Sequence, residues 1–329
     1  MNKLWIYLSF SFALGCFCSY IALNNRPAGL MAKAGSGAVA TSGFEICRTK
    51  DLNKIKPLSV ERIDESPVFD PLKFDLARLV DSLKNGGALT QASVYIREFD
   101  HREWMALNKD EQYHPASLMK VPLLICCLQT LQLNPSLFDQ KLVYDKPDSV
   151  QINPQFYAYP TIQPGKSYSV HELLYYMIAY SDNNATWLLA RHFDTSRMKK
   201  LFADFCLPEP VPDDLKFTMS AKDYSTFIKA IYSCSLLSPE YSEYAADLMS
   251  NCSFREGFAK GFPEGTRMWH KFGEWRSMGF DYELHESGIV NIKDKPYLIT
   301  IMTKGRDTEK QAEIIRLISR RIYDKIPTP

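Results

Sequence analysis

The sequence has almost no excess of charge of either sign. Among its 329 residues, 39 Lys and Arg stand against 38 Asp and Glu, so the formal net charge is +1. This balance argues against a broad nucleic-acid-binding surface and against a funnel for an acidic substrate. Apolar residues make up 46% of the chain, which is enough for a sizeable core and excludes global disorder. At about 150 residues per domain, the length indicates one or two domains.

Several common signatures are also missing. The chain has no Walker loop, no GxGxxG turn and no GxSxG nucleophile elbow, and His171-Glu172 is not completed to HExxH. The eight cysteines include no CxxC pair, so their spacing predicts neither a zinc site nor a disulfide scaffold. We expect most of them to be small buried hydrophobic side chains.

One long uncharged run is present, from Leu4 to Leu23. Twenty helical residues at about 1.5 Å each span roughly 30 Å, the thickness of a bilayer core. We therefore expect residues 1–25 to be a signal-anchor or a signal peptide that contacts the membrane through residues 4–23. Lipidation at Cys16 and a buried core helix are the alternatives for this run.

The next stretch is poor in periodic apolar residues. Asn24-Asn25-Arg26-Pro27 ends the apolar run, Ala, Gly and Ser dominate as far as Gly43, and no strong periodicity follows until Asp70. This composition predicts a flexible tether over residues 26–68. Residues 69–329 then form the folded domain.

Within that domain, helical and strand patterns alternate in blocks. The final helix is expected to begin with a capping box, Thr308-x-x-Gln311. Five strands flanked by terminal helices and interrupted by a helical middle predict an α/β sandwich with an all-α lobe, and a site in the cleft between them. The expected elements are helices at 74–85, 117–131 and 308–322, a helical middle at 169–252, and strands at 92–99, 104–107, 266–271, 284–292 and 297–303.

The first indication of a catalytic site is an SxxK motif. Ser117 and Lys120 are three residues apart, so they share one face of a helix. A lysine that is neutral can take the proton of the hydroxyl and generate a nucleophile. The apolar residues that follow, 121–125, are expected to bury this helix. The motif is weak alone, because Ser196 and Lys199 match it too.

Two further motifs follow in order along the chain. Ser181-Asp182-Asn183 occurs once, between two predicted helices, and Lys271-Phe272-Gly273 is expected at the end of a strand. A K-x-G pattern alone carries little information, since Lys33-x-Gly35 and Lys84-x-Gly86 match it as well. The order and context of all three motifs make the combination informative.

With these motifs the sequence resembles the penicillin-recognising serine hydrolases, most closely the class A β-lactamase type, over residues 70–325. This resemblance implies the β-lactamase/transpeptidase-like fold, a five-stranded antiparallel sheet flanked by helices plus an all-α lobe. It also implies a location outside the cytoplasmic membrane, in the bacterial cell envelope. The segments that carry it are 114–120 (HPASLMK), 180–186 (YSDNNAT), 262–266 (FPEGT) and 270–274 (HKFGE).

The resemblance assigns roles to the motif residues. Ser117 would be the acylated nucleophile, Lys120 its base, and Ser181 the group that passes a proton to the leaving nitrogen. Lys271 would supply positive charge toward Ser181 and the substrate carboxylate. Two nearby ammonium groups depress each other's pKa, which favours one of them as a base.

The resemblance also implies the substrate contacts. Asn183 would hold the substrate amide, Gly273 and Glu274 would line the substrate, and the backbone N–H groups of Ser117 and Glu274 would form an oxyanion hole. The expected substrate is a β-lactam or a peptidoglycan-derived acyl compound. No metal, organic cofactor or nucleic acid is expected, and the protein is expected to be a monomer.

Two departures from the family pattern concern recognition of the substrate carboxylate. Phe272 stands where the family has a threonine or serine whose hydroxyl binds that carboxylate. Ser287, not an arginine, precedes Gly288, and Arg276 is a candidate substitute.

A third departure concerns release of the acyl group. The family's loop glutamate, followed by an asparagine four residues later, is missing from 207–215, where Glu209, Asp213 and Asp214 are the only acids. If none of them orients water, the acyl-enzyme should be long-lived. The alternatives to a β-lactamase are therefore a penicillin-binding, D-alanyl peptidase-like or other envelope acyl hydrolase, and a non-catalytic membrane-tethered binding module.

Overall fold

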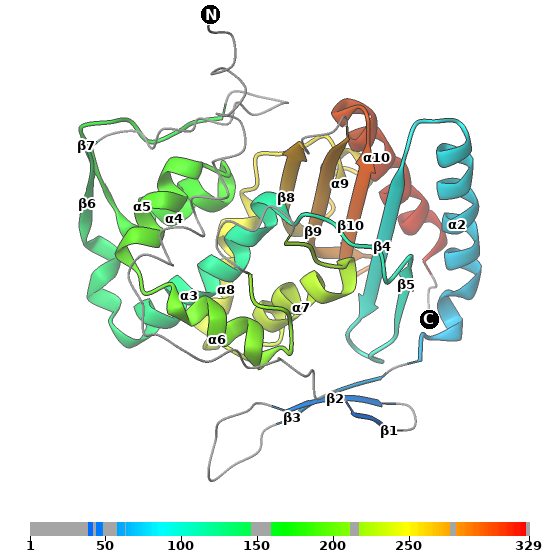
Figure 1. Cartoon of the computed structure of the whole chain (residues 1–329), viewed down its shortest axis with the longest axis horizontal. Coiled ribbons are helices and arrows are strands. Elements are labelled where there is room, and N and C mark those ends of the chain that lie inside the picture. The colour runs from blue at the N-terminus through cyan, green and yellow to red at the C-terminus, as the bar shows by residue number, and fades with distance from the viewer. Residues whose placement is uncertain are drawn as a thin grey trace, which may run out of the picture.

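A five-stranded antiparallel sheet forms one half of the domain, as the sequence predicts (Figure 1). The computed structural model describes residues 39–41, 44–48, 58–62, 64–145, 159–210, 217–276 and 281–326, so the predicted membrane run 4–23 lies outside the described residues. The strand order is β5-β4-β10-β9-β8, which leaves β8 at an edge. The strands are β4 (Gln91–Glu98), β5 (Trp104–Leu107), β8 (Met268–Arg276), β9 (Tyr282–Ile292) and β10 (Lys295–Gly305).

The two terminal helices of the domain cover one face of this sheet (Figure 1). They are α2 (Asp70–Asn85) and α10 (Thr308–Lys325), and the short α9 (Phe258–Gly261) packs beside α10. Leu72, Leu76 and Val80 recur at helical spacing on α2 and are buried against the sheet. A first hydrophobic core therefore lies between the sheet and these helices.

The other face of the sheet meets the all-α lobe. Helix α7 (Ala221–Tyr232) packs on β10 and β4 and joins the sheet to the lobe. The lobe also contains a two-stranded hairpin, β6 (Lys141–Tyr144) with β7 (Lys166–Ser169). Its remaining helices are α3 (Lys120–Leu133), α4 (Val170–Ala179), α5 (Asn183–His192), α6 (Ser196–Asp204) and α8 (Pro239–Ser250).

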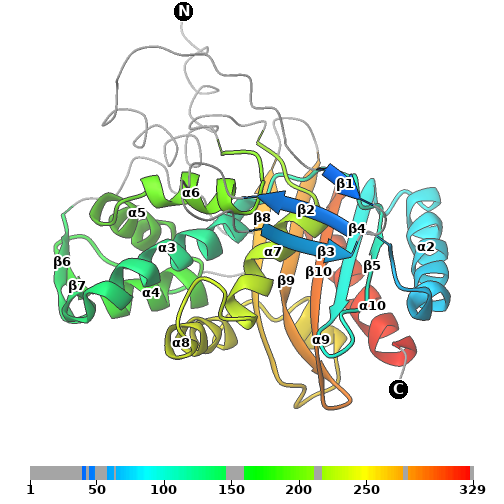
Figure 2. The same ribbon diagram turned by 90° about the horizontal axis from the view of Figure 1, so that it is seen from below.

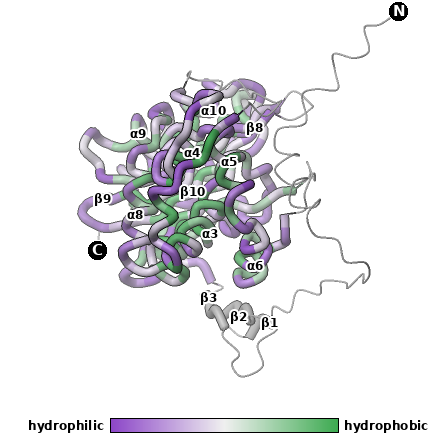
Figure 3. Tube along the Cα trace, turned by 90° about the vertical axis from the view of Figure 1, so that its left-hand side faces the viewer, coloured by the Kyte–Doolittle hydropathy of each residue, from purple (hydrophilic) through white to green (hydrophobic). Residues whose placement is uncertain are grey.

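Helix α3 is largely hydrophobic, as its green colour in Figure 3 shows, and its residues 120–128 and Leu131 are buried in the core of the lobe. The stretch Ala116–Leu133 is long and apolar enough to cross a membrane by length and composition, and 67% of it is buried inside the domain. This burial explains the high hydropathy of the stretch, because a helix that is apolar on every face is typical of a protein core.

The structure adds three short strands to the stretch in which composition predicts a tether. They are β1 (Val39–Thr41), β2 (Phe44–Arg48) and β3 (Leu58–Arg62), paired antiparallel in that order and drawn in blue in Figure 2. Runs of three to five residues are too short for their period-two pattern to stand out from a Ser- and Gly-rich background.

The predicted capping box at Thr308 is wrong by one residue. Asp307 is the N-cap of α10 and its carboxylate accepts a hydrogen bond from the Lys310 N–H at 2.8 Å. The Gln311 side chain faces inward and accepts a hydrogen bond from Thr303 Oγ1 at 2.9 Å. A capping box does occur at the start of α4, where Ser169 and Glu172 bond each other's backbone N–H.

Candidate active site

The predicted serine–lysine pair lies where the sheet meets the lobe. Ser117 is in a 3₁₀ helix, η2 (Ala116–Met119), and Lys120 begins α3. Lys120 Nζ lies 2.8 Å from Ser117 Oγ. The residue before the serine, Ala116, has a left-handed backbone (φ 51°), which costs an L residue about 1–2 kcal/mol. The turn that presents the hydroxyl is therefore held in place by its surroundings.

Lys120 Nζ has four hydrogen-bond partners. The Ser181 carbonyl oxygen at 3.0 Å and Asn183 Oδ1 at 2.7 Å can only accept hydrogen bonds. In the ammonium form a further N–H donates to Ser117 Oγ. In the neutral form the two obligate acceptors take both N–H groups, and the lone pair is free for the proton of Ser117. The Ser181 hydroxyl lies within reach as well, at 3.2 Å.

The electrostatic setting also favours the neutral form of Lys120. The side chain is only 4% exposed, and this burial lowers its pKa well below the usual range. The positive charge of Lys271 lowers the pKa further. An amine of this kind can act as the base that the SxxK motif requires.

The Ser181-Asp182-Asn183 turn is brought to the lysine as predicted. Ser181 has a left-handed backbone (φ 58°), and Asp182 is the N-cap of α5. The buried Asp182 carboxylate accepts hydrogen bonds from Thr161 Oγ1, the Ile162 N–H and the Asn184 N–H, at 2.8–2.9 Å. Asp182 thus positions its two neighbours, a role that the motif pattern alone did not assign.

Lys271 lies in the middle of β8, so the prediction that its motif ends a strand is wrong. The strand continues to Arg276 because its whole length pairs with β9. Lys271 is fully buried, and its Nζ donates to the Phe272 carbonyl oxygen at 3.0 Å. Burial lowers the pKa of Lys271 to about 8.

The side chain of Phe272 belongs to the sheet core. It is 2% exposed, and its ring stacks on Phe254 at a centroid distance of 4.7 Å. The Nζ of Lys271 lies 4.1 Å from the Phe272 ring centroid, a cation–π distance. Phe272 therefore supports the lysine instead of offering a hydroxyl to a ligand.

The other two positions considered for carboxylate binding have separate partners. Ser287 is fully buried and its hydroxyl lies 2.6 Å from Thr300 Oγ1. Arg276 is exposed at the end of β8, with its guanidinium 5.2 Å from the Tyr282 ring centroid.

Gly273 allows β8 to approach the serine-bearing turn closely. A Cβ atom at this position would lie 3.0 Å from both the Leu118 nitrogen and the Pro115 oxygen, which are backbone atoms. Glu274 follows directly and is half-buried beside this contact. The two predicted oxyanion donors, the N–H groups of Ser117 and Glu274, thus belong to two elements in close contact.

Of the three acids considered for water activation, the structure describes only Glu209. Glu209 forms an ion pair with Lys199 at 2.7 Å, with both side chains about half exposed. This contact also shows that the second SxxK match, Ser196 and Lys199, lies on the surface of α6. Asp213 and Asp214 lie outside the described residues.

The cysteines that the structure describes are of three kinds. Cys126, Cys127 and Cys252 are free and buried, as predicted, and Cys234 is free and exposed. Cys206 is disulfide-bonded, which the sequence did not predict. Within the described ranges, no three His, Cys, Asp or Glu side chains come together in a way that could hold a metal ion.

A five-stranded antiparallel sheet and an all-α lobe, with a Ser–Lys pair between them, define the fold of β-lactamase-like and penicillin-binding serine acyl hydrolases. The Beta-lactamase2 model, described as the beta-lactamase enzyme family, matches residues 72–326. The chain therefore belongs to this family.

Solved structures share this fold at low sequence identity. PBP-A is 22% identical with a TM-score of 0.64, over 79% of this chain and 97% of that chain. The TLA-3 extended-spectrum beta-lactamase is 17% identical with a TM-score of 0.67, over 78% and 98%. A class A beta-lactamase from Bacteroides cellulosilyticus DSM 14838 is 17% identical with a TM-score of 0.65, over 77% and 97%. A search of curated proteins finds no match to the chain.

Proposed function

We propose that the protein is a serine hydrolase that opens β-lactam amide bonds through an acyl-enzyme on Ser117. The observation that carries the proposal is the set of contacts around Lys120 Nζ. The Ser181 carbonyl oxygen and Asn183 Oδ1 accept from Lys120 Nζ, and Ser117 Oγ lies 2.8 Å from the same nitrogen, so a neutral amine there can take the serine proton. A variant of PBP-A is described as an acyl-enzyme complex with penicillin G, which supports a β-lactam as the acyl donor.

The proposed reaction begins at the serine hydroxyl. Ser117 Oγ attacks the carbonyl carbon of the amide while its proton moves to Lys120 Nζ. The negative charge that develops on the carbonyl oxygen is stabilised by the N–H groups of Ser117 and Glu274. Lys271, which is charged below pH about 8, adds positive charge to this region.

Collapse of the tetrahedral intermediate breaks the carbon–nitrogen bond. The Ser181 hydroxyl donates its proton to the leaving nitrogen and regains one from the Lys120 ammonium, which lies 3.2 Å away. The result is an ester on Ser117 and a neutral Lys120. Water then hydrolyses the ester and releases the acid.

A second candidate is a penicillin-binding or D-alanyl peptidase-like hydrolase of envelope acyl compounds. It is favoured by Glu209, whose carboxylate is held by Lys199 on the surface of α6. An ion-paired surface carboxylate of this kind is not placed to orient water, and if no other acid takes that role, deacylation is slow and the protein stays acylated. The buried Phe272 also leaves the family's carboxylate-binding hydroxyl without a replacement in β8.

We also propose that the domain works outside the cytoplasmic membrane, with residues 4–23 as its anchor or signal peptide. The disulfide at Cys206 supports this proposal, because disulfides persist in oxidising compartments. The expected partner at the site is a single small acyl compound.

Intact-mass spectrometry of the protein mixed with benzylpenicillin tests the proposed function. We expect one covalent adduct per molecule in the wild type, none in Ser117→Ala, and a normal adduct in Ser196→Ala, the matched serine of the surface motif. An adduct that decays within seconds favours the β-lactamase, and one that persists for minutes favours the second candidate. A folded wild type without any adduct, or an adduct that survives Ser117→Ala, refutes the proposal.

A further inference from the structure

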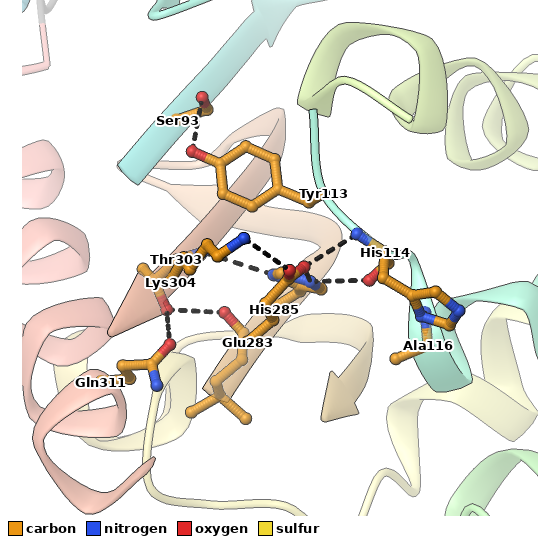
Figure 4. Close-up of polar contacts among 10 residues, drawn as sticks. Ser93, Tyr113, His114, Ala116, Glu283, His285, Thr303, Lys304 and Gln311 are labelled. Atoms are coloured by element: carbon orange, nitrogen blue, oxygen red, sulfur yellow. Dashed lines mark hydrogen bonds and ion pairs between the residues drawn. The ribbon is translucent and has the colours of Figure 1, made fainter. Parts of the chain in front are cut away.

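His114, three residues before Ser117, is held by the sheet through its backbone (Figure 4). Its N–H donates to Glu283 Oε2 at 2.8 Å, and its carbonyl oxygen accepts from His285 Nε2 at 3.0 Å. Glu283 and His285 both belong to β9, and all three residues are buried. The peptide groups on both sides of His114 are thus fixed to one strand.

The side chain of His114 makes two further contacts. Its Nδ1 accepts the N–H of Ala116 at 3.1 Å, which satisfies the backbone of the residue in the left-handed conformation. Its ring stacks on the indole of Trp275, with centroids 3.9 Å apart and planes 14° apart. Trp275 directly follows Glu274 on β8.

The hydrogen bonds fix the protonation of both imidazoles. A carbonyl oxygen can only accept, so His285 carries its proton on Nε2, and its Nδ1 accepts the Thr303 N–H at 3.3 Å. His114 Nδ1 also accepts, so it carries no proton. Burial lowers the pKa of His114 to about 4, which keeps this ring neutral at physiological pH.

Charged and polar neighbours on each side hold Glu283 in position. Lys304 Nζ of β10 lies 3.5 Å from its Oε1, and His285 Nε2 lies 3.5 Å from its Oε2. Tyr113 packs edge-on against His285 at 5.5 Å, and its hydroxyl is 3.0 Å from Ser93 Oγ. The acceptor for the His114 N–H is therefore fixed by residues of β9 and β10, and Ser93 of β4 holds the tyrosine that packs beside them.

We propose that His114 is a positioning residue that sets the separation of the two oxyanion donors, the N–H groups of Ser117 and Glu274. It is linked to the first donor through Ala116 and to the second through Trp275, while Glu283 and His285 fix it to the sheet. This inference rests on the proposed acyl-enzyme function. Because His114 touches neither the substrate nor the reacting atoms, it acts through the geometry of the turn.

The test measures the rate constant of acylation by benzylpenicillin in variants of the full chain. His114→Phe keeps a ring over Trp275 but removes the acceptor for the Ala116 N–H. We expect acylation to slow about 10- to 100-fold, because a misplaced oxyanion donor costs that much or more. The dissociation constant of the non-covalent complex should change less than about twofold. His101→Phe, in the exposed turn after β4, is the control.

A matched pair at Glu283 gives a second test of the same inference. Glu283→Gln retains an oxygen that can accept from the His114 N–H, and Glu283→Leu does not. We expect the Gln variant to acylate within about threefold of the wild type and the Leu variant to be slowed as strongly as His114→Phe. A purely structural role would lower the melting temperature and the acylatable fraction while leaving the rate constant of that fraction unchanged.

The outcomes separate the two proposals. If the folded wild type is not acylated, the proposed function is wrong, and so is the positioning role that rests on it. If the wild type is acylated and His114→Phe and Glu283→Leu react at the wild-type rate, only the positioning role is wrong. If His114→Phe does not fold, the Glu283 pair and Trp275→Leu, which removes the stack, decide the question.

Discussion

At the scale of single residues, burial lowers the pKa of two lysines that differ in their hydrogen-bond partners. Lys120 Nζ has two obligate acceptors and two hydroxyls around it, so a neutral amine there has a hydroxyl proton within reach. Lys271 donates to a carbonyl oxygen and lies over an aromatic ring, and both contacts suit a cation. The proposed mechanism uses one of these lysines as a proton acceptor and the other as a positive charge, and their different contacts distinguish the two roles.

The pKa of Lys271 predicts an alkaline limit to acylation. Its folded-state pKa of about 8 is below that of a free lysine, so the charge is present below pH 8 and is lost as the pH rises through this value. We expect the second-order rate constant for acylation by benzylpenicillin to fall about tenfold per pH unit above pH 8. Stopped-flow measurements between pH 6 and 10 check this.

The matched variant for this prediction is Lys271→Arg. A guanidinium stays charged over the whole range, so its profile should stay flat above pH 8, although at a lower rate. A wild-type profile that is flat up to pH 10 would mean that the charge of Lys271 does not contribute to acylation.

At the scale of elements, the contact between β8 and η2 determines whether the site can form. The contact depends on Gly273, because a Cβ there would meet two backbone atoms at 3.0 Å, and neither atom can turn aside as a side chain would. We expect Gly273→Ala to slow acylation by roughly 10- to 100-fold through displacement of Glu274 from Ser117.

The control for Gly273→Ala is Gly305→Ala on β10 of the same sheet. There the nearest atom to a Cβ, the Ala88 oxygen, is 3.4 Å away. This variant should acylate like the wild type and melt within a few degrees of it. Equal acylation rates in both variants would show that the close approach of β8 is not needed.

The sequence predicted those helices and strands whose apolar residues repeat with a clear period within the segment itself. Helix α2 and strands β4, β5, β9 and β10 follow from periodicity, and the sheet they build is the predicted one. The short strands β1 and β3 were missed because three to five residues are too few to show an alternating pattern. The N-cap at Asp307 was missed because a single carboxylate does not distinguish it from the neighbouring Thr308. The extension of β8 past Lys271 depends on its pairing with β9, which no local pattern shows.

The site was predictable from its motifs, but its supports were not. Ser117, Lys120, Ser181 and Asn183 come together as the motif order indicates. The His114–Glu283 hydrogen bond joins residues 169 positions apart and has no sequence signature. The role of Phe272 could be stated only in part, because the missing hydroxyl is visible in the sequence while the stack on Phe254 is not.

At the scale of the whole molecule, the site depends on both halves of the domain. Ser117 lies in η2 and Lys120 at the start of α3, Ser181 and Asn183 lie in the lobe, and Lys271 lies on the sheet. Helix α7 connects the halves, since the Ser225 hydroxyl lies 2.7 Å from Thr300 Oγ1 of β10 and the Tyr224 hydroxyl donates to the Leu118 carbonyl oxygen of η2 at 3.0 Å.

A crystal structure of the protein soaked with benzylpenicillin would show directly whether Ser117 is acylated. We expect continuous electron density from Ser117 Oγ to the carbonyl carbon of an opened β-lactam ring. The carbonyl oxygen should lie within about 3 Å of the N–H groups of Ser117 and Glu274. An intact β-lactam ring in a well-ordered site, or an ester on a different side chain, would contradict it.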